Sequence, residues 1–214
     1  MMQRYAVIHT VMPREFVLLQ GRGCKWKQCT FCDYHTDVSE DPFSVNREVL
    51  ACVTGIYGVL DVINSGSAIE LDGQTIKEIK RIVKEKNIHT LWFESHYMYR
   101  HKLEKFAEQF DGVDVKFRCG IESFDGALRE LWKKGVSSDV TVEDVAKYFH
   151  GVCLLCCTEA DSKERISRDI ALAEQYFEYA SVNVFCENTT HVRRDNNLTK
   201  WFLKEVYPEL KQSK

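Results

Sequence analysis

The chain alternates between short apolar segments and longer segments with helical periodicity, and it does so about six times in 214 residues. Runs rich in Val, Ile, Leu and Phe are typical of strands that are buried on both faces of a parallel sheet. The predicted strands span residues 16–20, 60–64, 90–94, 115–121, 152–157 and 181–186. Strands that alternate with helices predict an α/β fold with a parallel sheet and right-handed crossovers.

Apolar residues at helical spacing predict the helices between these strands. Ile76, Ile79 and Ile82 form a stripe over residues 74–86, and similar stripes mark residues 103–110 and 166–177. Thr141-Val-Glu-Asp144 is a capping box that opens another short helix. A complete eight-unit barrel needs about 250 residues. We therefore expect a partial (βα)6 TIM-like barrel, with a flat doubly wound sheet as the alternative. In both folds the site lies at the C-terminal ends of the strands.

The composition predicts a cytoplasmic protein that acts on a small molecule. No apolar run approaches the roughly 20 residues that cross a bilayer, and the N-terminus lacks the apolar stretch of a signal peptide. The net charge of −3 gives no basic excess, so we expect neither membrane association nor stable nucleic-acid binding. We expect one domain over residues 1–214, with an N-terminal extension (1–15), a barrel core (16–190) and a C-terminal helix (191–214).

Three of the nine cysteines, Cys24, Cys29 and Cys32, lie within nine residues directly after the first predicted strand. In an intracellular chain such a cluster indicates a metal site rather than a disulfide framework. Thiolates are soft ligands that suit an iron–sulfur cluster or zinc. A structural zinc site prefers four ligands, and His35 could be the fourth. Three thiolates on a cubane cluster would leave one iron open, which suits a catalyst.

Other conspicuous residues are expected to have structural roles. The remaining cysteines are expected to pack as small hydrophobic side chains. They are Cys52, Cys119, Cys153, Cys156, Cys157 and Cys186. Lys133, Lys134 and the charges of residues 77–86 are expected on solvated helix faces.

The cysteine motif resembles that of the radical S-adenosylmethionine (SAM) superfamily, whose members carry three cysteines on the loop after the first strand of a partial (βα)6 barrel. The commonest spacing there is C-x3-C-x2-C, whereas this chain has C-x4-C-x2-C, a departure that concerns the subfamily more than the chemistry. The resemblance extends over about residues 16 to 190. It implies a [4Fe-4S] cluster, SAM as cosubstrate, and an electron donor such as flavodoxin or ferredoxin.

Further segments resemble the SAM-binding elements of this superfamily. Residues 64–67 (Asn-Ser-Gly-Ser) are similar to the stretch that receives the SAM amino group. Glu94 and Glu122 each end a predicted strand, where a carboxylate is costly unless it is paired or binds a ligand. The resemblance implies that SAM contacts Phe31, Asn64, Ser65, Gly66, Ser67, Glu94 and Glu122.

The small size, the cysteine spacing and the Cys-Asp-Tyr-His continuation at residues 32–35 resemble the small queuine lyases of bacterial queuosine salvage. These enzymes release 7-aminomethyl-7-deazaguanine from queuine by removing its cyclopentenediol. The resemblance implies a radical SAM lyase that acts on a deazaguanine-type base. Asp33 or Glu187 could accept the N1–H and exocyclic amine of the base. The expected substrate-binding residues are Asp33, Tyr34, His35, Tyr97, Arg118, Glu187 and Asn188, with His35, Tyr97 and Asn188 as partners of the diol.

Two other functions remain open on the sequence alone. One is a radical SAM enzyme that acts on another modified nucleoside or on a peptide. The other is a non-enzymatic zinc-binding module that uses the three cysteines and His35.

Overall fold

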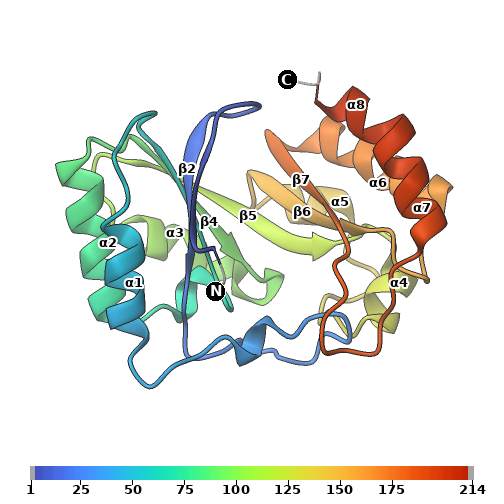
Figure 1. Cartoon of the computed structure of the whole chain (residues 1–214), viewed down its shortest axis with the longest axis horizontal. Helices are drawn as coiled ribbons and strands as arrows, with labels where there is room; N and C mark the ends of the chain where they lie inside the picture. Colours follow the sequence, from blue (N-terminus) through green and yellow to red (C-terminus); the bar gives the residue numbers. More distant parts are fainter. Residues whose placement is uncertain (1–2, 212–214) are drawn as a thin grey trace. The chain divides into compact units, whose positions relative to one another are not determined.

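The structure, a computed structural model, describes residues 3–211 (Figure 1). It divides into two compact units: the first holds residues 3–27 and 34–118, and the second holds residues 28–33 and 119–211. The described strands form one sheet in chain order. They are β1 (Tyr5–Ile8), β2 (Arg14–Leu19), β3 (Val59–Asn64), β4 (Thr90–Ser95), β5 (Asp114–Glu122), β6 (Gly151–Cys156) and β7 (Tyr179–Val184). All six predicted strands are confirmed, with bounds that differ by at most two residues.

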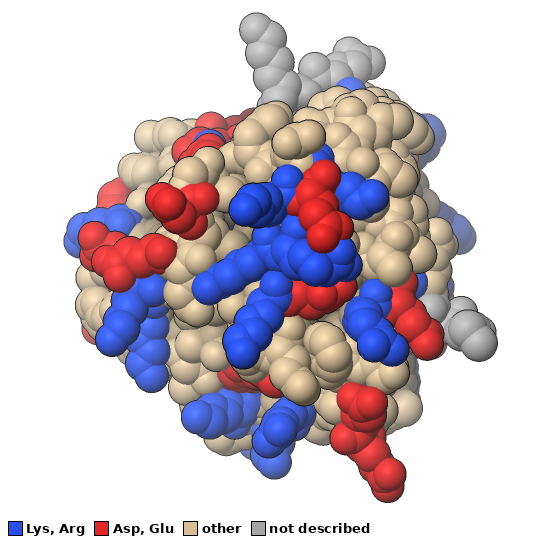
Figure 2. All heavy atoms as spheres, turned by 90° about the vertical axis from the view of Figure 1, so that its left-hand side faces the viewer, with Lys and Arg blue, Asp and Glu red and all other residues tan. Residues whose placement is uncertain are grey.

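The first unit contains a mixed sheet with helices on one face (Figure 1). β2, β3 and β4 are parallel, and Leu60 of β3 lies opposite Leu91 of β4. α1 (Pro42–Leu50) and α2 (Gly73–Glu85) pack together, and α1 contacts β2. The predicted apolar stripe of α2 is buried. On its solvated side Arg81 pairs with Glu78 and Glu85, and Figure 2 shows basic side chains interspersed with acidic ones on this face of the molecule.

The N-terminal residues add a strand that the sequence did not predict. β1 runs antiparallel to β2, with Tyr5 opposite Val17. All four residues of β1 are half-buried, so the strand lacks the buried–exposed alternation that would have marked it. The helix predicted for residues 103–110 is also shorter than expected. Its α-helical part is α3 (Leu103–Ala107), which follows the 3-10 segment η3 (Tyr97–Lys102). Phe110, in the predicted helix, is instead buried in the turn after α3.

The second unit is built on the parallel pair β6 and β7, against which α6 (Lys163–Tyr176) packs. The capping box of Thr141 and Asp144 opens α5 (Val142–Ala146), as predicted. α4 (Gly126–Leu131) follows β5. The C-terminal helical residues run from 196 to 210 as α7 (Asn196–Trp201), a π-helical segment (Phe202–Val206) and α8 (Tyr207–Leu210). Residues 212–214 of the predicted C-terminal helix lie outside the described residues.

The packing role predicted for the other cysteines is confirmed for four of them and wrong for two. Cys119, Cys153, Cys156 and Cys157 are buried. Cys52 and Cys186 are exposed in connecting segments, each two residues after the end of an element, α1 and β7 respectively. Between residues 3 and 211, no helix combines the length and the apolar character that a membrane span requires.

Candidate active site

The three clustered cysteines lie on the connection between β2 and the 3-10 turn η1 (Tyr34–Thr36). All three thiols are half-buried and free of disulfides; Cys24 belongs to the first unit, whereas Cys29 and Cys32 belong to the second. Among the described residues, no three His, Cys, Asp or Glu side chains are placed to share one metal ion. A [4Fe-4S] cube does not require such convergence, because each thiolate binds a different iron at its own corner. The donor set therefore fits a cluster of this kind.

The Asn64–Ser67 segment leaves the C-terminal end of β3 with its polar side chains buried. Asn64 Nδ2 donates to the Ser67 carbonyl at 3.3 Å, and Ser67 Oγ accepts the His96 backbone N–H at 3.0 Å, which ties the ends of β3 and β4 together. Asn64 Oδ1 is buried without a hydrogen-bond partner among the described residues. A buried acceptor without a partner costs about 1–3 kcal/mol. The segment therefore offers an acceptor to a ligand N–H group.

Gly66 brings this segment against the cysteine loop. A Cβ added at Gly66 would collide with Glu70 Oε2 and would lie 3.2 Å from Cys24 Cα. Ser65, the residue before Gly66, also holds this loop, because its Oγ accepts the Gly21 backbone N–H at 2.9 Å. Glycine, which lacks a Cβ, allows this approach without displacing either neighbour.

Glu94 and Arg118 belong to a buried ionic network. Arg118 donates to both carboxylate oxygens of Asp61 at 3.0 and 3.1 Å, and its Nε lies 3.6 Å from Glu94 Oε2. Arg14 Nε also donates to Asp61 at 2.9 Å. Arg118, an expected substrate-binding residue, is buried, and its guanidinium is held by Asp61. Asp61 was not among the predicted site residues, although a single carboxylate inside the apolar strand Val-Leu-Asp-Val-Ile-Asn was a usable signal.

The second half of the cysteine motif is anchored in the apolar core of the second unit. The Phe31 ring contacts the Trp132 ring edge-on at 5.4 Å, and the Thr30 N–H donates to the Trp132 carbonyl at 3.0 Å. Cys29 and Cys32 pack against the same cluster. One side of each of these two half-buried residues is therefore packed against apolar side chains.

Glu122 ends β5 in a strained conformation beside a buried cation. Its φ angle is +67°, a region that non-glycine residues rarely adopt. Lys134 Nζ donates to Glu122 Oε1 at 2.9 Å. The prediction that Lys134 lies on a solvated face is wrong, because the turn at Lys133 (φ +50°) and Gly135 folds Lys134 back onto β5. Burial lowers the pKa of Lys134, but the charges of Glu122 and Cys29 outweigh it and raise the pKa overall. Lys133 is exposed, as predicted.

Two of the expected substrate residues fasten the loop after β7 to the cysteine motif. Asp33 accepts the backbone N–H and the hydroxyl of Thr189 at 3.0 and 2.9 Å. Asn188 Nδ2 donates to the Phe31 carbonyl at 2.7 Å. Glu187, the third candidate in this unit, is exposed.

The remaining substrate candidates lie in the first unit. Tyr34 is exposed and His35 is half-buried in η1. Tyr97 is buried at the start of η3, with the Arg100 guanidinium 4.6 Å from its ring centre.

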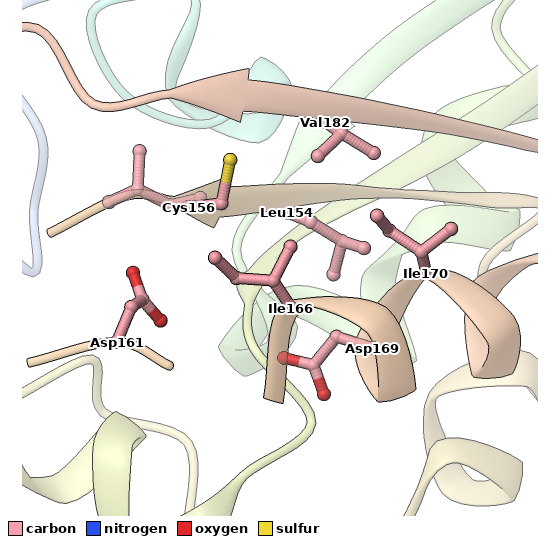
Figure 3. Close-up of a pocket in the computed structure, with 8 residues that line it drawn as sticks. Leu154, Cys156, Asp161, Ile166, Asp169, Ile170 and Val182 are labelled. Atoms are coloured by element: carbon pink, nitrogen blue, oxygen red, sulfur yellow. The ribbon is translucent and has the colours of Figure 1, made fainter. Parts of the chain in front are cut away.

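A small cavity in the second unit is separate from the predicted site residues (Figure 3). It lies between α6 and the strands β6 and β7, and its polar lining includes Asp161 and Asp169. Burial raises the pKa of both carboxyl groups. None of the residues predicted to bind a cofactor or a substrate lines it.

Comparison with known proteins identifies the class of the protein. No protein-family model and no curated protein matched the chain. A solved structure, a queuine lyase from Clostridium spiroforme bound to SAM and queuine, matches 100% of this chain and 93% of that chain, with 38% sequence identity and a TM-score of 0.91. The chain is thus an α/β protein with the partial (βα)6 barrel of radical SAM enzymes, as predicted. Within that class it belongs to the queuine lyase family.

Proposed function

We propose that this protein is a queuine lyase that uses SAM and a [4Fe-4S] cluster to release 7-aminomethyl-7-deazaguanine from queuine. The observation that carries the proposal is the match over the entire chain to a queuine lyase that holds both SAM and queuine. Cys24, Cys29 and Cys32 are the cluster ligands in this proposal. When bound and reduced by a donor such as flavodoxin or ferredoxin, the cluster supplies the electron for the reductive cleavage of SAM.

Residues at the strand ends would bind and orient SAM. Asn64 Oδ1 accepts a hydrogen bond from the SAM amino group, which satisfies its buried lone pairs. Glu94 is oriented by Arg118, and Glu122 by Lys134, so each carboxylate is fixed before the ligand arrives. Such preorganisation reduces the ordering that binding would otherwise require. Ser65, Gly66, Ser67 and Phe31 complete the proposed SAM contacts.

The hydrogen bonds of the second unit favour Glu187 over Asp33 as the carboxylate that binds the base. One oxygen of Asp33 already accepts two hydrogen bonds from Thr189, whereas Glu187 is exposed in the loop after β7. Glu187 would accept the N1–H and the exocyclic amine in a bidentate manner. His35, Tyr97 and Asn188 are the proposed partners of the diol, Tyr34 is a further proposed substrate contact, and Arg118 acts through Glu94.

An anaerobic assay tests this function. Protein reconstituted with iron and sulfide is incubated with dithionite, SAM and queuine, and products are separated by liquid chromatography with mass detection. We expect 7-aminomethyl-7-deazaguanine to form, and we expect Cys29→Ala to form none. Guanine in place of queuine is the substrate control. A preparation with a complete cluster that cleaves SAM but leaves queuine intact would refute the assignment of the substrate. A preparation that binds zinc and no iron would refute the cluster.

A further inference from the structure

Glu70 lies between the cysteine loop, the Asn64–Ser67 segment and η3. Its Oε2 accepts the Lys25 backbone N–H at 3.2 Å, directly after Cys24. Its Oε1 accepts the Tyr99 hydroxyl at 2.8 Å. Glu70 is also the last residue of the 3-10 turn η2 (Ala68–Glu70), which directly follows the Asn64–Ser67 segment. One carboxylate therefore joins three segments that meet around Cys24.

The contacts of Gly66 place the Glu70 carboxylate and the Cys24 backbone on the same side of that glycine. A Cβ added there would meet Glu70 Oε2 and Cys24 Cα together. The charge environment agrees with this geometry. Burial raises the pKa of Tyr99, and the hydrogen bond and charge of Glu70 and the charge of Cys24 raise it further. Tyr99 therefore stays protonated at neutral pH and remains a donor to Glu70.

We propose that Glu70 is a positioning residue that fixes the Cys24 end of the cysteine loop and, through its negative charge, lowers the reduction potential of the bound cluster. This inference rests on the proposed function, because it requires a cluster at Cys24. Net charge and solvent exposure around an iron–sulfur cluster set its potential. A fixed anion disfavours the added electron, and in partly buried surroundings it is only weakly screened by salt.

A redox titration of the reconstituted protein, followed by electron paramagnetic resonance, tests the proposal without using turnover. Glu70→Gln keeps the size of the side chain and removes its charge. We expect this variant to raise the equilibrium constant for reduction of the cluster about tenfold, which is a positive shift in potential of about 59 mV for one electron. Glu85→Gln is the matched control, because it removes an equal charge at the far end of α2. We expect the potential of this control to equal that of the wild type.

Tyr99→Phe provides a second variant in case Glu70→Gln fails to assemble a cluster. It keeps the ring and leaves the Glu70 carboxylate with one donor fewer, so we expect the potential to shift in the negative direction. An unchanged potential in Glu70→Gln, an equal shift in Glu85→Gln, or a positive shift in Tyr99→Phe would overturn the inference. These outcomes differ from a failure of the proposed function, in which wild-type protein assembles no cluster or leaves queuine intact.

Discussion

At the scale of single residues, the site is marked by a buried acceptor atom without a partner in the described part of the chain and by a strained backbone position. Asn64 Oδ1 has no partner among the described residues, and Glu122 is held at a positive φ angle by its place at the end of β5. Such strain and missing partners are tolerated where a ligand compensates for them. The sequence identified both positions through resemblance. It missed Lys134 and Asp61, because a charged residue in a local pattern does not reveal a partner that is distant in the chain.

Asn64→Ala tests the residue scale directly. We expect the Kd for SAM to rise about 10- to 100-fold, since a hydrogen bond to a charged group contributes about 1.5–3 kcal/mol. The free energy of unfolding without ligand should change by less than about 1 kcal/mol, because the lost bond to Ser67 is offset by removal of a buried acceptor. Isothermal titration calorimetry under anaerobic conditions and urea unfolding measure the two quantities. Asn197→Ala, at an exposed position, is the control, and equal SAM affinity in both variants would contradict the expectation.

At the scale of elements, Glu15 of β2 holds the edge of the first unit together. The side chain is fully buried, and it accepts hydrogen bonds from Tyr5 of β1 at 2.7 Å and from the backbone of Thr54 and Gly55 at 2.7 and 2.6 Å. Burial alone would raise the pKa of Glu15, but these hydrogen bonds outweigh it and lower the pKa below the usual value. Burial and Glu15 raise the pKa of Tyr5 to about 12.

The lowered pKa of Glu15 predicts a dependence of stability on pH. The stabilisation is present above the unfolded-state pKa, near 4.5, and is lost as the pH falls through the lower folded-state value. We expect Glu15→Gln to lower the free energy of unfolding by at least about 2 kcal/mol at pH 7, because the side-chain amide would face two backbone N–H donors. The difference in the free energy of unfolding between this variant and the wild type should shrink below about pH 4.5. Urea unfolding between pH 3 and 7 measures it, with Glu85→Gln as the exposed control. A difference that stays constant with pH would contradict this account.

The elements also show why prediction from sequence succeeded unevenly. The strands β2 and β6 were predicted because their apolar runs are nearly continuous, and α2 because Ile76, Ile79 and Ile82 are regularly spaced. β1 was missed because its residues are uniformly half-buried. α1 was missed as well, although Asp41 and Pro42 form a recognisable start at which the Asp41 side chain accepts the Ser44 N–H. The capping residues at the start of α1 therefore indicate a helix that the spacing of apolar residues alone does not reveal.

At the scale of the whole molecule, ligand binding should appear as added stability. A ligand that binds only the folded state at 100 times its Kd stabilises it by about 2.7 kcal/mol. We expect SAM at that ratio to raise the thermal midpoint of the reconstituted protein by several degrees. Oxidative removal of the cluster with ferricyanide and a chelator should abolish most of the shift. Anaerobic differential scanning fluorimetry measures both states. An equal SAM-induced shift after removal of the cluster would contradict the proposed mode of binding.

The compact units are not contiguous in the chain, and this has a consequence for biosynthesis. Residues 28–33 belong to the second unit, whereas the rest of that unit begins at residue 119. A ribosome that adds 5–20 residues per second therefore exposes Phe31 and two cysteines on the order of ten seconds before Trp132 and Phe185 emerge to cover them. For that interval the nascent polypeptide presents two thiols beside an uncovered aromatic ring. Cys29 and Cys32 therefore reach their packed positions only after residue 185 has been synthesised.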